Sequence, residues 1–100
     1  NLVQHPFDAD GYSNMGVALM WMTQIGGEDN RATAKLCFEK ATELDPTFSE
    51  FWAHRARMEH FFGNLAGEIA LWEKVLQLDP NHESANRLLP DLMKQMEKGK

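Results

Sequence analysis

The chain has one cysteine, four prolines, seven glycines and no long apolar run, and each shortage excludes a class of protein. A single cysteine, Cys37, excludes an internal disulfide framework and a zinc site built from cysteines. So few prolines and glycines exclude collagen-like and linker-like chains. A membrane-spanning helix needs roughly 20 consecutive apolar residues, so we expect no membrane insertion.

Basic residues are also scarce, because ten lysines and arginines face fifteen acidic residues and leave a net charge of −5. This charge would repel a nucleic-acid backbone, so we expect no nucleic-acid partner. No basic segment followed by an apolar stretch opens the chain, so no secretory signal is predicted. The compartment is left open between cytoplasm and periplasm. Of the 100 residues, 43% are hydrophobic, which is enough for one small folded domain.

The sequence repeats itself at an interval of 34 residues, the distance from Pro46 to Pro80. The segment 38–46 returns as the segment 72–80, with an aromatic residue, a Glu-Lys pair, a leucine and Asp-Pro in matching places. So long a match at one offset predicts two copies of one supersecondary unit.

Each copy has the pattern of two helices. Apolar and small residues recur at steps of three and four through 34–44 and again from 69 to 76, and both runs end at Leu-Asp-Pro. Earlier helices are predicted over about 10–26 and 49–62, closed by Gly26-Gly27 and Gly63-Asn64. Ser49 and Asn81 are predicted as N-caps of the helices that follow each Asp-Pro. Strand patterns are absent, so the predicted fold class is all-α.

The predicted organisation is an N-terminal arm over 1–9 and a single domain over 10–100. The domain comprises repeat one (10–46), repeat two (49–80) and a capping helix (83–97) that is bent or started afresh at Pro90. Repeat one has six extra residues, which we expect to lengthen its first helix and the following loop over 25–30. The arm contains Leu2, Val3 and Phe7, and it is expected to fold back over the domain or to dock into a neighbouring chain.

Paired helices with a 34-residue period resemble the tetratricopeptide repeat. The pattern of that family, an aromatic residue and a small residue four apart on the first helix, is met by Tyr12 with Gly16 and by Trp52 with Ala56. Its second-helix pattern is met by Ala34, Phe38, Ala41 and Pro46, and less closely by Glu68, Trp72, Val75 and Pro80. The resemblance implies an α–α superhelix of two helical hairpins plus a C-terminal capping helix.

The sequence also carries two narrower resemblances. A Trp followed seven residues later by Glu, here Trp52 and Glu59, is similar to the half-a-TPR repeats of RNA-processing scaffolds. The long first hairpin with its alanine-rich second helix (30–41), and the later run Ile69, Trp72, Glu73 and Leu76 followed by a closing helix, look similar to the C-terminal repeat domains of cytochrome c maturation proteins. The second resemblance implies binding of the C-terminal segment of an apocytochrome. Ser13 and Val17 occupy the positions where chaperone-binding members carry Lys and Asn, so that activity is not expected.

The tetratricopeptide resemblance implies a concave groove, lined by the first helices, in which a peptide or protein segment binds. Projection on a helical wheel predicts the peptide-binding residues Val17, Trp21, Ala53, Arg57, His60, Phe61, Arg87 and Lys94, with Met20 near the edge. Aromatic and arginine anchors are enriched at binding hot spots, and the basic ones are expected to engage acidic groups or a terminal carboxylate. The alternative is a structural self-assembly unit, a homodimer, in which these side chains are buried.

No residue pattern supports catalysis, a cofactor or a metal site. The sequence has no glycine-rich phosphate loop, nucleophile elbow or His-Glu-x-x-His motif. The four histidines, including His5 and the separated pair His54 and His60, are interpreted as solvated surface groups. Cys37, Met15 and Met22 are assigned to the core, and Arg55 with Glu59 to a structural ion pair inside the hairpin. We therefore expect a protein that is not an enzyme.

Overall fold

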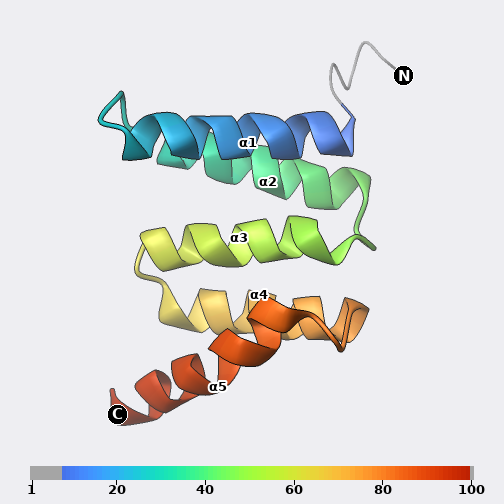
Figure 1. Cartoon of the computed structure of the whole chain (residues 1–100), viewed down its shortest axis with the longest axis vertical. Coiled ribbons are helices and arrows are strands. Elements are labelled where there is room, and N and C mark those ends of the chain that lie inside the picture. Colours follow the sequence, from blue (N-terminus) through green and yellow to red (C-terminus); the bar gives the residue numbers. More distant parts are fainter. Residues whose placement is uncertain (1–7, 100) are drawn as a thin grey trace. The chain divides into compact units, whose positions relative to one another are not determined.

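The computed structural model describes residues 8–99, and its regular elements are all helices (Figure 1). Its elements are α1 (Ala9–Gln24), α2 (Arg31–Leu44), α3 (Ser49–Phe61), α4 (Leu65–Leu78) and α5 (Glu83–Lys98). No strand occurs within these residues, so the predicted all-α class is confirmed. Most of the predicted N-terminal arm, including His5 and its apolar side chains, lies outside the described residues.

The chain divides into two compact units between Pro46 and Thr47. The first unit contains α1 packed on α2, and the second contains α3 packed on α4 with α5 against α4. The boundary coincides with the predicted end of repeat one. Each repeat therefore corresponds to one helical hairpin, and the capping helix belongs to the second unit.

The helix ends follow local signals. Gly26 and Gly63 adopt φ values of +91° and +74°, the left-handed region that glycine enters without a steric cost, as expected from glycines that follow helices. The predicted N-caps are wrong by one residue at both helices. Helix α3 has Phe48 at its cap position, and α5 is capped by His82, whose Nδ1 accepts the Ala85 N–H at 3.2 Å.

The six-residue extension of the first copy is divided equally between helix and turn. Helix α1 has 16 residues against 13 in α3, and the turn 25–30 is three residues longer than the turn 62–64. Thr23 stabilises the longer turn, because its hydroxyl accepts the Asn30 N–H at 2.9 Å and donates to the Leu19 carbonyl at 3.0 Å.

The last helix continues through Pro90, so a separate helix starting at that residue is ruled out. Proline lacks an N–H group, and it is tolerated here because Pro90 is exposed while Ala85, Leu89 and Leu92 face the core.

The core of the first unit depends on a close approach between Gly16 of α1 and Phe38 of α2. A Cβ atom at Gly16 would lie 2.7 Å from the Phe38 ring, so only glycine fits without displacing the ring. Ala34, Phe38 and Ala41 are buried, as their spacing predicts. The methionines differ from the prediction: Met22 is exposed, and Met20, expected near the edge of the solvent-facing side, is buried.

The core of the second unit is centred on Trp72, which is fully buried. It is surrounded by small and aliphatic side chains from three helices: Ala53, Ala56, Val75, Ala85, Leu89 and Leu92. Trp72 is the repeat equivalent of Phe38, and Ala56 is the equivalent of Gly16. In both hairpins, therefore, a buried aromatic ring on the second helix is accompanied by a small buried residue on the first.

Candidate functional site

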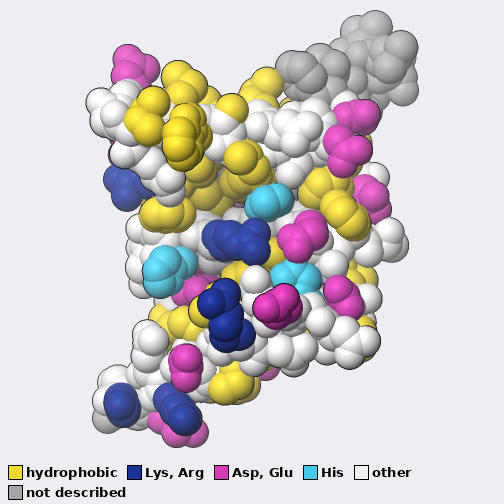
Figure 2. Space-filling view, viewed as in Figure 1, with side chains coloured by type: hydrophobic (Ala, Val, Ile, Leu, Met, Phe, Trp, Pro, Cys, Tyr) yellow, Lys and Arg dark blue, Asp and Glu magenta, His cyan; other side chains and the backbone are white. Residues whose placement is uncertain are grey.

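Helix α1 exposes large apolar side chains. Val17, Trp21 and Ile25 are 47%, 63% and 64% exposed, as the helical wheel predicts. Asp10 is the only charged residue between Ala9 and Gln24. Hydrophobic side chains gather visibly over α1 in Figure 2. A solvent-exposed tryptophan on a helix with almost no charge is typical of a surface that contacts another molecule.

The predicted residues of the second unit have a different character. Phe61 is 44% exposed at the end of α3, beside the exposed His60. Arg57 is half-buried on α3, whereas Arg87 and Lys94 are exposed on α5. Basic and histidine side chains gather over α3 and α5 in Figure 2.

Ala53 was predicted to contact the ligand, and this is wrong because its side chain is fully buried. Its equivalent in the first copy, Ser13, is also buried. Ala53 belongs to the same apolar cluster as Trp72 of α4 and Ala85 of α5. The buried part of α3 is thus wider than the single stripe that a helical wheel assumes.

The guanidinium group of Arg57 is held by two neighbours. Its carbon lies 5.6 Å from the centre of the Trp72 ring, and Nη1 lies 3.4 Å from Nδ1 of His54. Burial lowers the pKa of His54 below its ordinary value, and the charge of Arg57 lowers this pKa further, against an opposing effect of Glu50. His54 is therefore neutral near pH 7, so Nδ1 can accept a hydrogen bond from Arg57.

A buried carboxylate, that of Glu68, lies at the start of α4 and was not assigned a role from the sequence. It is only 5% exposed, accepts the indole N–H of Trp72 at 3.2 Å and lies 3.2 Å from Nδ1 of His60. The signal was available, since Glu68 occupies the position held by Ala34 in the first copy. A charged group in place of a small one indicates a polar network.

The interpretation of the histidines as solvated holds only in part. His60 is exposed, but His82 is buried and its Nε2 lies 2.8 Å from Oε1 of Glu50. His54 is partly buried. Sequence alone did not reveal that His82 caps a helix and faces the core.

Glu59 is buried inside the second hairpin, as its assignment to a structural pair requires. Its Oε2 accepts a hydrogen bond from Nδ2 of Asn64 at 2.9 Å. The guanidinium of Arg55 lies 5.0 Å from the centre of the Trp52 ring. The ion pair between Arg55 and Glu59 stays a prediction.

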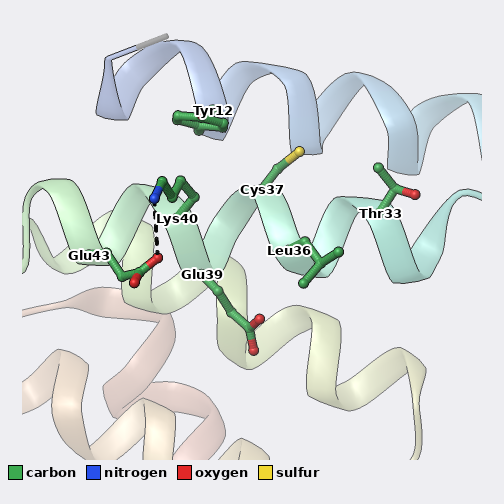
Figure 3. A pocket seen from close by; sticks show the side chains of 7 residues that line it. All are labelled: Tyr12, Thr33, Leu36, Cys37, Glu39, Lys40 and Glu43. Carbon is green, nitrogen blue, oxygen red and sulfur yellow. Dashed lines mark ion pairs between the residues drawn. The ribbon is translucent and has the colours of Figure 1, made fainter. Parts of the chain in front are cut away.

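A shallow cavity of about 330 Å³ lies between α1 and α2, apart from all the predicted binding residues (Figure 3). Its lining includes Tyr12, Leu36, Cys37 and the pair Lys40–Glu43, whose charged atoms are 3.9 Å apart. Burial raises the pKa of the Cys37 thiol, so the sulfur stays protonated and poorly nucleophilic. The assignment of Cys37 to the core is confirmed.

Within residues 8–99, no group of three or more His, Cys, Asp or Glu side chains is arranged to hold a metal ion. No helix in the same range has the length and apolar character needed to cross a bilayer. The sequence matches no protein-family model and no curated protein. The candidate site is therefore assigned from the exposed residues of this chain alone.

Proposed function

We propose that the chain is a tetratricopeptide-like protein–protein interaction module that binds a peptide or protein segment. In the first unit, Val17 and Trp21 contact apolar side chains of the ligand. In the second unit, Phe61 contacts apolar side chains, and Arg57, Arg87 and Lys94 contact acidic groups. The observation that carries the proposal is the 63% exposure of Trp21 on a helix with one charged residue.

The exposed apolar side chains can supply most of the affinity. Burying a large apolar side chain stabilises a complex by roughly 1.5–3 kcal/mol, and the exposed rings of Trp21 and Phe61 are the largest such groups proposed to contact the ligand. Aromatic rings also lose little conformational entropy on binding, which is why they dominate hot spots.

The basic side chains are available to a ligand. Among the described residues, none of Arg57, Arg87 and Lys94 forms an ion pair with a carboxylate. An acidic ligand would therefore not have to displace an existing partner. The apocytochrome C-terminal segment implied by the narrower resemblance is one hypothesis for such a ligand.

Self-association is the second candidate, and the scarcity of charge on α1 favours it. Two copies that carry a net charge of −5 repel each other overall, yet they can meet through α1 with little local repulsion. In that case Trp21 would be buried in a homodimer.

The test is selection from a display library of random 12-residue peptides against the purified chain, followed by affinity measurements on the enriched sequences. We expect Trp21→Ala and Phe61→Ala to weaken binding about tenfold or more. Leu36→Ala is the matched control, because Leu36 is 65% exposed on α2 and lies outside the proposed surface.

Failure to enrich any peptide, or equal loss in all three variants, would contradict the proposal. Analytical ultracentrifugation of the purified chain, which measures its oligomeric state, distinguishes self-association from peptide binding. A dimer that dissociates in Trp21→Ala but persists in Leu36→Ala would assign the α1 surface to self-association instead.

A further inference from the structure

Arg57 differs from Arg87 and Lys94 because its guanidinium lies against two neighbouring side chains. The fully buried ring of Trp72 lies below it at 5.6 Å, and Nδ1 of His54 lies 3.4 Å from Nη1. Ring and imidazole together hold a group that otherwise rotates freely, so the entropy lost on contact with a ligand is already reduced.

The charge of Arg57 lacks a negative partner among the described residues. Of the acidic residues on the same helix, Glu50 has its Oε1 2.8 Å from Nε2 of His82, and buried Glu59 accepts a hydrogen bond from Nδ2 of Asn64. A half-buried guanidinium without an anion loses hydration and gains no ion pair in exchange. A bound anion would restore that interaction while Trp72 and His54 keep the group in place.

We propose that Arg57 is a preorganised anchor for one carboxylate group of the bound peptide, and that His54 is the residue that positions its guanidinium. This inference rests on the proposed peptide-binding function and specifies the chemistry of one contact within it. Arg donors are arranged to meet two carboxylate oxygens at once.

A single carboxylate fits this position better than a phosphate dianion. His54 is neutral near pH 7, so Arg57 supplies one positive charge to the site. The carboxylate of Glu50 is close enough to His54 to influence its pKa, and it would repel a second negative charge. A monoanion is balanced by Arg57, whereas a dianion is not.

The side chains of Arg87 and Lys94 are not preorganised in this way. Both are exposed on α5, and within residues 8–99 neither has an aromatic or imidazole support. We expect them to attract acidic ligands at a distance, with an effect that salt screens, rather than to bind a defined group.

The first experiment is NMR titration of the full chain with sodium acetate and, separately, with sodium phosphate at constant ionic strength. We expect acetate to give saturable shifts at the Arg57 Nε–H and the Trp72 indole N–H. Arg57→Gln should remove the shift of the Trp72 indole, whereas Lys98→Gln, which removes the same charge from the end of α5, should retain it.

Chemical-shift changes that are equal at Arg57, Arg87 and Lys94 and do not saturate would overturn the proposal, because non-specific screening gives this response. Tighter binding of phosphate than of acetate would also overturn it, since the site would then favour a dianion.

The positioning role of His54 is tested by rotation of the guanidinium, measured from exchange of the Arg57 Nη protons. We expect His54→Ala to speed this rotation and weaken acetate binding about tenfold, and His54→Gln, which keeps a hydrogen-bond acceptor, to restore part of both. Unchanged rotation in His54→Ala would contradict the role.

Peptides from the display selection separate this inference from the proposed function. Each enriched peptide is compared with versions whose C-terminus or acidic side chains are amidated. If one amidation weakens peptide binding to the wild-type chain about tenfold but does not weaken binding to Arg57→Gln, the anchor is supported. The group whose amidation has this effect is then the source of the carboxylate. Equal binding of all versions, still dependent on Trp21, would refute the anchor and leave the proposed function intact.

Discussion

The two hairpins share their buried positions and differ in their exposed ones. Phe38 and Trp72 are buried at equivalent places, as are Gly16 and Ala56. The first helices of the two hairpins match at an offset of 40 residues. At this offset the exposed Val17 of α1 corresponds to the half-buried Arg57 of α3. The comparison shows that the interior determines the hairpin, because close packing admits few alternatives, whereas the outer face is free to acquire a separate chemistry.

One buried position departs from this rule. Ala34 of the first hairpin corresponds to Glu68 of the second, and both are buried. The second hairpin accommodates the carboxylate because Trp72, unlike Phe38, has an N–H group to donate to it. The indole N–H thus allows a charged residue to be buried at the position where the first hairpin has the small residue Ala34.

The largest expected effect comes from Trp72→Phe, which gives the second hairpin the ring of the first. The change leaves a cavity and removes the hydrogen bond to Glu68, so we expect a loss of about 3 kcal/mol in the free energy of unfolding. Urea unfolding followed by circular dichroism measures it.

The double variant Trp72→Phe with Glu68→Ala should lose less than the two single changes together. Strict additivity would show that the indole and the carboxylate do not interact.

A smaller effect is expected from the helix caps. The side chain of Asn64 accepts the Gly67 N–H and donates to buried Glu59, whereas the side chain of Asn30 makes no capping hydrogen bond to α2. We expect Asn64→Ala to cost about 2 kcal/mol and Asn30→Ala about 0.5 kcal/mol. Thermal unfolding of both variants tests this, and equal losses would remove the distinction between the hairpins.

Gly16→Ala copies the small residue of the second hairpin into the first. Alanine favours helix, but its Cβ would overlap the Phe38 ring, so we expect a net loss of about 1 kcal/mol. Adding Phe38→Leu should reduce that loss in urea unfolding. A variant more stable than the wild type would show that the ring moves aside without cost.

The smallest effect is a pH dependence confined to the second hairpin. Because the pKa of folded His54 lies below the value of about 6.5 in the unfolded chain, the unfolded state takes up a proton first as the pH falls. The free energy of unfolding therefore decreases from about pH 7 toward the lowered pKa.

His54→Asn, which installs the residue found at the equivalent Asn14, should make this decrease shallower when unfolding is measured at pH 7.5 and 5. Asn14→His is the matched control. Its exposed ring should add no new pH dependence, and an equal effect of the two changes would argue against burial as the cause.

Much of the scaffold was predictable because its signals are local. The Leu-Asp-Pro ends, the glycines after the first helices and the 34-residue period predicted five helices close to their observed bounds. Exposure of Trp21 also followed from helical periodicity. Ala53 and Met22 were wrong because a helical wheel does not tell how many neighbours a helix packs against.

The sequence by itself determined where the helices form and which residues repeat, since hydrogen bonding, capping and periodicity operate within a few turns of the chain. Only the tertiary structure decided the state of the polar groups: His82 is buried beside Glu50 of α3, Glu68 of α4 lies against His60 of α3, and Arg57 of α3 lies over the Trp72 ring of α4. Those roles depend on neighbours supplied by other helices, and the surroundings of a charge, more than its type, determine whether it is hydrated, paired or free to bind a ligand.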